Sequence, residues 1–478
     1  MPNESYALEP TPDEMREMVR QATERIVAHI ETLPEQPASD IDGAPELSRS
    51  LVEEAPEHGV PLDQLLILVI DRLALKSFTN AGPGFMAYIP GGGLFESAVA
   101  DFVSGSINRY VTVWTAAPGL VQLEVNVIRW FSRLVGYGES AGGYLSSGGS
   151  IANFTAVFTA RRERLPDDFL NGTIYVSNQI HHSVTRAAAL AGFPESAIRV
   201  IPVDSEWRIE VSEVERAIAR DRDSGLTPFM IVGSAGTTNT GAVDDLEALA
   251  DVAERENLWL HLDAAYGGFF VLTDRGRHLM PGIGRADSIT LDPHKGLFLP
   301  YGTGCLLVKD RKALKRAHTV HADYMPTLQE SDDLIDFCEI SPELSRDFRG
   351  LRVWLPIKMR GLEAFRAALD EKLDLTEWAC RELQTIDGIE IVAKPQLSVV
   401  AFRLALPDLP RQEANRINEE LLDCINAKKR VFLTGTVLDG RFVLRICVLN
   451  FRTHQDRLEM CLEDVRAVVA EVTKVAGA

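Results

Sequence analysis

The chain has 478 residues, of which 46% are hydrophobic and 25% charged, so it is long enough for two or three globular domains and is not disordered as a whole. Its formal net charge of −20 argues against nucleic acid or an anionic membrane as a partner, although a local pocket can still bind one phosphate. No apolar run is long enough for a membrane-spanning helix and the first residues are polar, so we expect a cytoplasmic protein.

The chain opens with a capped amphipathic helix. Thr11 is a typical N-cap, Pro12 fits a first helical turn, and Glu14 completes a capping box. Apolar residues then recur at helical spacing until Pro34. This helix has no obvious surface of its own to cover, so docking on the large domain and docking on a second subunit are both open. We favour a second subunit.

A glycine-rich loop and a second helical region follow. Residues 82–93 contain too many glycines for a regular element, but their aromatic side chains indicate a loop that packs against something. Residues 94–136 are expected to be helical with an interruption at 117–119. Residues 144–150 then form a Ser/Gly loop that opens a helix running to Arg161. Such a loop at a helix N-terminus is either an anion site or an ordinary serine-capped helix start.

Beyond this loop, apolar runs alternate with helical stretches such as 211–220 and 245–256. Six runs are expected to be buried strands: 174–177, 198–203, 229–234, 259–263, 288–291 and 304–308. This alternation predicts an α/β domain, in which a mostly parallel sheet has helices on both faces.

Several polar residues follow the ends of these strands. His181 and Thr237 lie in loops after strands, Asp263 ends a strand, and Lys295 follows the next one. In a parallel sheet these ends share the edge where open α/β sheets bind ligands. A nucleophilic lysine and an ionised carboxylate are what pyridoxal phosphate (PLP) requires, for a Schiff base and for the ring nitrogen. Taken singly, each residue is more often a surface charge, a cap or a structural histidine.

The remaining third of the chain departs from this pattern. Residues 315–345 are irregular, and a long irregular segment inside a compact domain is usually functional, so we interpret it as a lid. Residues 351–383 are expected to be a long helix that leads to a smaller α+β domain. Its predicted strands and helices are 389–392, 399–403, 431–433 and 442–448, and 411–428 and 454–472. The six cysteines form no CxxC pair, so we expect reduced thiols and no metal site.

Five short motifs occur together in the order found in one enzyme family. They are 147–150, 177–181, 236–238, 261–266 and 293–295. With them the chain, from about Gly82 to its C-terminus, resembles the PLP-dependent group II amino-acid decarboxylases, which include the aromatic-L-amino-acid, histidine and glutamate decarboxylases. The stretches 344–346 and 442–445 resemble the aromatic type most closely.

The resemblance implies a fold-type-I PLP enzyme. We therefore expect a large α/β domain with a mostly parallel seven-stranded sheet sandwiched by helices, a small α+β domain and an N-terminal helical segment. The expected boundaries are 1–90 for the N-terminal dimerisation segment, 91–350 for the PLP-binding domain and 351–478 for the small domain. A homodimer with the site at the subunit interface is also implied.

The resemblance further implies decarboxylation of an L-amino acid, with an aromatic substrate favoured by resemblance alone. Lys295, Asp263 and His181 would be catalytic: Lys295 would form the Schiff base, Asp263 would pair with the ring nitrogen, and His181 would stack on the ring. The implied cofactor-binding residues are Lys295, Asp263, Ala265, His181, Gly149, Ser150, Thr237, His294 and Asp292. The implied substrate-pocket residues are Tyr88, Ile89, Phe337 and Tyr324.

Two positions depart from the family pattern. Phe337 stands where the family has a lid tyrosine that donates a proton, so either Tyr324 or His181 donates it, or O₂ reacts and the chain is an aldehyde synthase. Asp292 stands where the family often has Ser or Asn, and a carboxylate beside a phosphate is unfavourable unless one of them is protonated or turned away. A PLP-binding protein without turnover is the alternative from another class.

Overall fold

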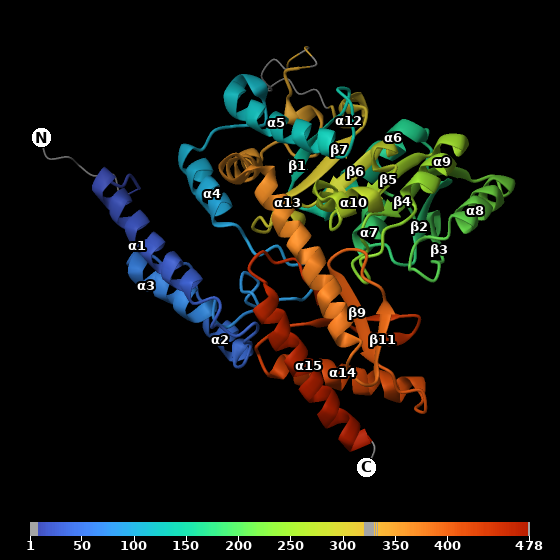
Figure 1. Cartoon of the computed structure of the whole chain (residues 1–478). Helices are drawn as coiled ribbons and strands as arrows, with labels where there is room; N and C mark the ends of the chain where they lie inside the picture. The colour runs from blue at the N-terminus through green and yellow to red at the C-terminus, as the bar shows by residue number, and fades with distance from the viewer. Residues whose placement is uncertain (1–7, 320–328, 330, 332, 477–478) are drawn as a thin grey trace, which may run out of the picture.

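The computed structural model describes residues 8–319, 329, 331 and 333–476. Figure 1 shows a body built around a large sheet, a smaller sheet below it, and N-terminal helices along one edge. Helix α13 runs from the large sheet to the small one. Among the helices of these residues, none is both long and apolar enough to cross a membrane. The same residues contain no group of three His, Cys, Asp or Glu side chains that could hold a metal ion.

The N-terminal segment confirms the predicted capped helix. The backbone N–H of Glu14 donates to the Thr11 hydroxyl, and the Glu14 carboxylate accepts from the Thr11 N–H. The elements of this segment are α1 (Pro12–Glu31), α2 (Ala44–Ser50), α3 (Leu62–Leu66) and the π-helix η1 (Ile67–Leu73). None of these four elements has a buried residue, and α1 and α3 lie side by side at the edge of the molecule (Figure 1).

The second helical region is also confirmed, but its break covers residues 108–117 and so begins earlier than the predicted 117–119. It consists of α4 (Phe95–Ile107), the 3₁₀ turn η2 (Trp114–Ala116) and α5 (Pro118–Leu134). Pro118 occupies the first turn of α5, where its missing N–H costs no hydrogen bond. Helix α5 buries one side against the large sheet, and this packing brings the chain back to the start of that sheet.

The large sheet has seven strands in the order β1-β7-β6-β5-β4-β2-β3. They are β1 (Gly142–Ser146), β2 (Gly172–Ser177), β3 (Ile198–Ile201), β4 (Thr227–Ser234), β5 (Trp259–Asp263), β6 (Ser288–Leu291) and β7 (Gly304–Val308). Only β7 runs antiparallel to its neighbours, so the sheet is mostly parallel as expected. Ser234 pairs with Asp263, and Asp263 pairs with Thr290, so the carboxyl ends of β4, β5 and β6 are level.

One strand was not predicted. Residues 144–146 were expected to belong to the loop before a helix, but they lie in β1, which pairs with β7. A side chain at Gly143 would put a Cβ 2.0 Å from the carbonyl oxygen of Leu306, so only glycine allows this close approach. Two consecutive glycines at the start of the strand removed the apolar pattern by which the other strands were recognised.

Helices cover both faces of the large sheet. Met230 and Val232 of β4 pack in one core with α6 (Gly149–Arg164), α7 (His182–Leu190) and α12 (Arg311–His318). Ile231, between them in the sequence, packs in the other core with α5, α8 (Val211–Asp223) and α9 (Leu246–Glu256). The short elements of this region are η3 (Glu195–Ala197), η4 (Gly268–Leu272), α10 (Asp274–Leu279), η5 (Ile283–Arg285) and α11 (Pro293–Gly296). Both faces are buried, as the continuous apolar runs predicted.

The C-terminal part is a four-stranded antiparallel sheet backed by helices. Its elements are η6 (Phe337–Glu339), α13 (Arg349–Leu383), β8 (Ile389–Ala393), β9 (Val399–Leu404), α14 (Arg411–Ala427), β10 (Thr434–Leu438), β11 (Arg441–Cys447) and α15 (Gln455–Ala476). Helix α13 is interrupted at Gly361, whose φ of 71° places it in the left-handed region. The strand predicted at 431–433 is wrong: Phe432 makes an isolated bridge with Phe85, and the strand begins afterwards, at Thr434. The three domain boundaries stay a prediction.

Candidate active site

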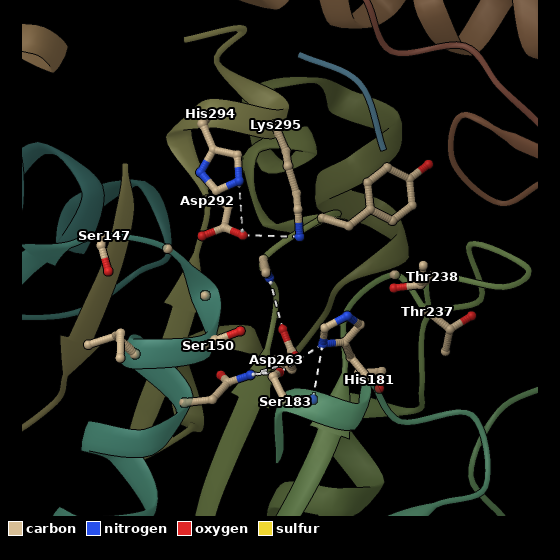
Figure 2. Close-up of a pocket in the computed structure, with 18 residues that line it drawn as sticks. Ser147, Ser150, His181, Ser183, Thr237, Thr238, Asp263, Asp292, His294 and Lys295 are labelled. Carbon is tan, nitrogen blue, oxygen red and sulfur yellow. Dashed lines mark hydrogen bonds and ion pairs between the residues drawn. The ribbon is translucent and has the colours of Figure 1, made fainter. Parts of the chain in front are cut away.

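A cavity of about 280 Å³ lies where the carboxyl ends of β4, β5 and β6 meet the N-terminus of α6. Figure 2 shows its lining side chains pointing toward one another from these separate elements. All nine residues predicted to bind the cofactor line it: Gly149, Ser150, His181, Thr237, Asp263, Ala265, Asp292, His294 and Lys295. Because the strand ends are level, residues that are far apart in the sequence lie together around this cavity.

The N-terminus of α6 forms one wall of the cavity. Strand β1 ends at Ser146, and helix α6 begins three residues later at Gly149. A Cβ on Gly149 would lie 3.0 Å from a carboxylate oxygen of Asp292 and 3.3 Å from the methyl group of Ala265, so glycine keeps this wall open. The first N–H groups of any helix lack partners within the helix, and the helix dipole favours negative charge there. This wall is suited to a phosphate.

Lys295 lies in the short helix after β6, with its ammonium group facing a carboxylate. Its Nζ is 3.0 Å from Oδ2 of Asp292, whose side chain is 3% exposed. Burial favours the neutral lysine, but the charges of Asp292 and Asp263 outweigh burial and raise the pKa of Lys295. The second oxygen of Asp292, Oδ1, is buried and has no hydrogen-bond partner among the residues that the structure describes.

Asp263 ends the central strand β5 and is almost completely buried. Its Oδ2 accepts a hydrogen bond from Asn153 Nδ2 at 3.1 Å, and its Oδ1 accepts one from the backbone N–H of Ala265 at 3.2 Å. Because a carboxylate has about four acceptor positions, two donors leave it able to accept a further hydrogen from a group in the cavity. A protonated ring nitrogen is such a group.

His181 caps helix α7 and reaches into the cavity. Its Nδ1 accepts a hydrogen bond from the backbone N–H of Ser183 at 3.2 Å and lies 2.8 Å from the Ser183 hydroxyl. Burial lowers the pKa of His181, against the charge of Asp263, which raises it. The imidazole is therefore neutral at neutral pH. On another wall, His294 Nδ1 lies 2.6 Å from the carbonyl oxygen of Thr303, so this nitrogen carries a hydrogen and donates it.

These groups fit PLP. The N-terminus of α6 offers a place for the phosphate, Lys295 offers an amine for the aldehyde, and Asp263 offers an acceptor for the ring nitrogen. His181 and Ala265 line the same cavity, so that an imidazole and a methyl group are available to contact the ring. The unpartnered oxygen of Asp292 is a further polar atom that a bound group could satisfy.

The predicted substrate residues at the glycine-rich loop do not line the cavity within one chain. Ile89 is 6% exposed, packs in the hydrophobic core and does not line the cavity of a single chain, so its assignment to the pocket stays a prediction. The side chain of Tyr88 is largely exposed, at 54%, and does not line the cavity either. Its carbonyl oxygen accepts from Arg445, which also donates to the carbonyl of the lining residue Thr238, so Tyr88 is tied to the cavity's edge.

Phe337 does not line the cavity within one chain, so its assignment to a lid and to the substrate pocket stays a prediction. Phe337 is 1% exposed and lies in the core, with the guanidinium of Arg346 4.7 Å from its ring centre. Asp336, the residue before it, fixes the turn by accepting from the backbone N–H of Trp114 at 2.6 Å. Helix α12 likewise replaces the start of the predicted lid. Tyr324 lies outside the described residues.

Sequence reasoning missed Asn153 and Ser183, which both line the cavity. Asn153 lies one helical turn after Gly149, so its side chain is on the same face of α6 as the glycine. Ser183 lies two residues after His181, where a hydroxyl can reach back to the capping side chain. A polar residue one turn inside a suspected anion-binding helix was the available signal for Asn153.

Comparison with known proteins gives the same answer as this geometry. The model of the pyridoxal-dependent decarboxylase conserved domain matches residues 45–405. The chain is 36% identical to an aromatic-L-amino-acid decarboxylase from Bacillus atrophaeus over 98% of both chains, and 27% identical to a phenylacetaldehyde synthase from Petunia hybrida over 88% and 87%. Its fold is similar to the crystal structure of Oryza sativa TDC with PLP and tryptamine, with a TM-score of 0.92, 24% identity and coverage of 98% and 99%.

The chain therefore belongs to the pyridoxal-dependent group II decarboxylase family. It is a carboxy-lyase, and PLP is its cofactor. The fold-type-I architecture expected from the sequence is confirmed by the seven-stranded, mostly parallel sheet and the smaller antiparallel sheet.

Proposed function

We propose that the chain decarboxylates an L-amino acid with an aromatic side chain and releases the amine and CO₂. The observation that carries this proposal is that Lys295 and Asp263 face one buried cavity at the N-terminus of α6. The aromatic side chain is supported by the relative from Bacillus atrophaeus, an aromatic-L-amino-acid decarboxylase that is similar over the whole chain. This proposal includes the roles of the individual residues.

PLP, when bound, supplies an aldehyde that condenses with amines and a ring that accepts the electron pair left by departing CO₂. Lys295 provides the amine that anchors the cofactor, and for this its Nζ must lose a proton. Oδ2 of Asp292, 3.0 Å away, stabilises the ammonium form of Lys295 and so opposes this loss until the proton moves away. Asp263 accepts the hydrogen of the ring nitrogen and so keeps that nitrogen protonated, which acts on charge that develops during the reaction.

The remaining residues of the cavity bind and orient. The N–H groups at the start of α6, with the hydroxyl of Ser150, would hold the phosphate by hydrogen bonds. His181, neutral at neutral pH, would contact the ring and help to orient it. Asp263 is buried and His181 is half-buried, so they would limit the access of water to the ring, which strengthens each electrostatic interaction there.

A single assay tests this proposal. The purified full-length chain, loaded with PLP, is incubated with a panel of aromatic and acidic L-amino acids while CO₂, amine, aldehyde and peroxide are measured together. We expect CO₂ with a stoichiometric amount of amine from an aromatic substrate. CO₂ from acidic substrates alone would overturn the aromatic assignment, and CO₂ accompanied by aldehyde and peroxide would overturn amine formation.

Oxidative formation of an aldehyde is the second candidate. It is supported by the similarity to the petunia phenylacetaldehyde synthase. It was first suggested by Phe337, but a buried phenylalanine in the core at η6 gives it no further support. The proton that returns to the substrate carbon in amine formation would come from His181 or Tyr324. The peroxide measurement separates the two reactions.

We also propose that two copies of the chain form a homodimer. The N-terminal helices expose an unusual number of large apolar side chains, and exposed apolar patches of this kind mark interfaces. They are Met15, Met18, Val19, Ile26, Val27, Leu65, Ile67 and Val69. Light scattering of the full-length chain should give twice the mass of one chain, and Met18→Asp with Val27→Asp should reduce it. A monomeric unmodified chain would refute the dimer.

A further inference from the structure

We propose that Asn153 is a positioning residue that orients both polar walls of the cavity. Its amide holds the carboxylate of Asp263 and, through Ser183, keeps the ring hydrogen of His181 on the nitrogen that faces the cavity. His261 and Ser288 fix the amide from behind. The inference rests on the proposed function for its meaning, since that function gives Asp263 and His181 their roles, but its geometry stands independently.

The orientation of Asn153 follows from Asp263. An ionised carboxylate only accepts hydrogen bonds, so the amide atom 3.1 Å from Asp263 Oδ2 must be the NH₂ group. The other hydrogen of this NH₂ group reaches the Ser183 hydroxyl at 2.9 Å. The amide oxygen therefore faces the opposite way, where it lies 3.1 Å from His261 Nε2. All four side chains are buried, so water does not compete for these hydrogen bonds.

The hydrogen bonds that link Asn153 to His261 and Ser288 have one consistent donor-to-acceptor direction. An amide oxygen only accepts, so Nε2 of His261 carries the hydrogen and Nδ1 carries a lone pair. Ser288 lies 2.8 Å from this Nδ1 and accepts from the indole N–H of Trp259 at 2.8 Å, so its own hydrogen points to the histidine. Burial lowers the pKa of His261 to about 4, which keeps the ring neutral and the direction fixed at neutral pH.

The hydrogen bonds from Asn153 through Ser183 to His181 also have a defined direction. The Ser183 hydroxyl accepts from Asn153 and has one hydrogen to give. Nδ1 of His181 already accepts from the backbone N–H of Ser183 at 3.2 Å, so it has a lone pair and receives the hydroxyl hydrogen at 2.8 Å. The neutral ring must then carry its hydrogen on Nε2, the nitrogen that points into the cavity in Figure 2. His181 thus presents a donor to whatever binds there.

One amide therefore couples Asp263 and His181, which would both contact the cofactor ring. If Asn153 turned by half a rotation, its oxygen would face the carboxylate of Asp263, and its NH₂ would face a ring hydrogen of His261. Both contacts would be repulsive, so the network behind Asn153 prevents this rotation. Cooperative hydrogen bonds of this kind make the members depend on one another more than separate pairs would.

The first experiment reads the ring nitrogens of His181 directly. The full-length, PLP-loaded chain is labelled with ¹⁵N-histidine, and nitrogen chemical shifts are followed against pH, with His181 assigned by its absence in His181→Gln. We expect the Nε2–H form at neutral pH. Ser183→Ala should raise the pKa of His181 by about one, because a donor to the neutral form is lost, whereas Ser183→Thr keeps the hydroxyl and the original pKa. The Nδ1–H form in the unmodified chain would overturn the proposal.

The second experiment measures PLP affinity by the quenching of tryptophan fluorescence. Asn153→Ala should weaken PLP binding about tenfold or more, as expected for loss of a hydrogen bond to a charged group. The matched control is Thr159→Val, which removes a different buried polar group from α6, a hydroxyl that donates to the carbonyl of Thr155 and contacts His318. Equal weakening in both variants, or none in Asn153→Ala, would mean that Asn153 has only a structural role.

These outcomes are separate from those of the proposed function. Absence of CO₂ from every substrate would refute the decarboxylase proposal but would leave the ring-nitrogen and affinity results unchanged. Normal CO₂ release with an Nδ1–H His181 would refute the role of Asn153 alone. A double substitution, Asn153→Ala with Ser183→Ala, adds a further criterion: the loss of affinity should be less than the product of the two single losses if the residues act as one unit.

Discussion

The two sides of the cavity differ in how completely their polar groups are satisfied. On the Asp263 side, the carboxylate, Asn153 and His261 form a closed set of hydrogen bonds. On the Lys295 side, Oδ2 of Asp292 lies 3.0 Å from Lys295 Nζ and 3.7 Å from His294 Nε2, and its other oxygen is buried without a partner among the described residues. The first side holds its geometry by itself and keeps an acceptor position of Asp263 for a bound group, whereas the second side leaves a buried oxygen of Asp292 without a partner.

The position of each side in the fold explains this difference. Asp263 lies at the end of β5, between β4 and β6 in the sheet, with α6 packed across that strand. Lys295 lies in a single turn of helix after β6, on a connection whose ammonium must form and break a bond with the cofactor. A group that only polarises a ring benefits from a fixed environment, whereas a nucleophile needs an exchangeable partner.

The largest effect on turnover is expected on the Asp263 side of the cavity, which we call the fixed side. Asp263→Ala should still bind PLP, because the N-terminus of α6 and Lys295 remain, but kcat should fall roughly a thousandfold, since the ring nitrogen loses the acceptor that keeps it protonated. Cofactor content by absorbance and CO₂ release by a coupled assay measure the two parts. Asp292→Ala, on the exchangeable side, is the comparison variant. Turnover close to normal in Asp263→Ala would contradict the assigned role.

A smaller effect is expected on the Lys295 side of the cavity, the exchangeable side. Asp292→Asn keeps the shape of the side chain but removes a negative charge 3.0 Å from Lys295 Nζ, so the pKa of the lysine should fall. A larger fraction of neutral lysine should then capture PLP at neutral pH, and the rate of capture should rise severalfold. Stopped-flow absorbance of PLP added to the cofactor-free chain, as a function of pH, measures this rate. A slower capture would mean that Asp292 acts chiefly as the proton acceptor.

The residues expected to contact the cofactor could be predicted from the sequence better than the residues that position them. Asp263 and Lys295 could be predicted because each lies at or after the end of a strand whose apolar run is visible in the sequence, and strand ends converge in this topology. Asn153 was not, because a polar residue inside a helix has no distinguishing pattern in the sequence. Its partner His261 alternates with apolar residues in β5 and reads as part of a buried strand.

Two departures from what the sequence predicted share another cause. Strand β1 was hidden by glycines that allow close backbone contact, and Phe337 was assigned from its place along the chain between Asp336 and residues 344–346, which match the family pattern. Distance along the chain does not say whether a segment is open or packed. The contacts that decide this for Phe337, with Arg346 and with the core, join residues whose proximity only the folded chain reveals.

The fixed side should also be visible in the pH dependence of stability. Burial lowers the pKa of His261 from 6.5 to about 4, so the unfolded chain binds a proton below pH 6.5 that the folded chain does not bind until about pH 4. Stability is therefore present above pH 6.5 and is lost as the pH falls toward 4, by on the order of 3 kcal/mol for this residue.

Urea unfolding at a series of pH values measures this loss. His261→Asn should lessen it by about that amount, while His318, whose pKa burial also lowers to about 4, keeps its own contribution. The same substitution at an exposed position, His278→Asn, is the matched control. An unchanged slope in His261→Asn would mean that the network behind Asn153 does not depend on a neutral histidine.

The smallest effect on the reaction is expected from Phe337, which lies on neither side of the cavity. Phe337→Tyr should leave the ratio of amine to aldehyde unchanged, because the ring is buried in the core and its added hydroxyl does not reach the cavity. Stability should fall by about 1–3 kcal/mol, since the hydroxyl is buried without a prepared partner. Phe402→Tyr, in the core of the small sheet, should cost a similar amount. A product ratio that changes with Phe337→Tyr alone would show that this position reaches the reacting atoms after all, and would restore the aldehyde synthase argument that its burial removes.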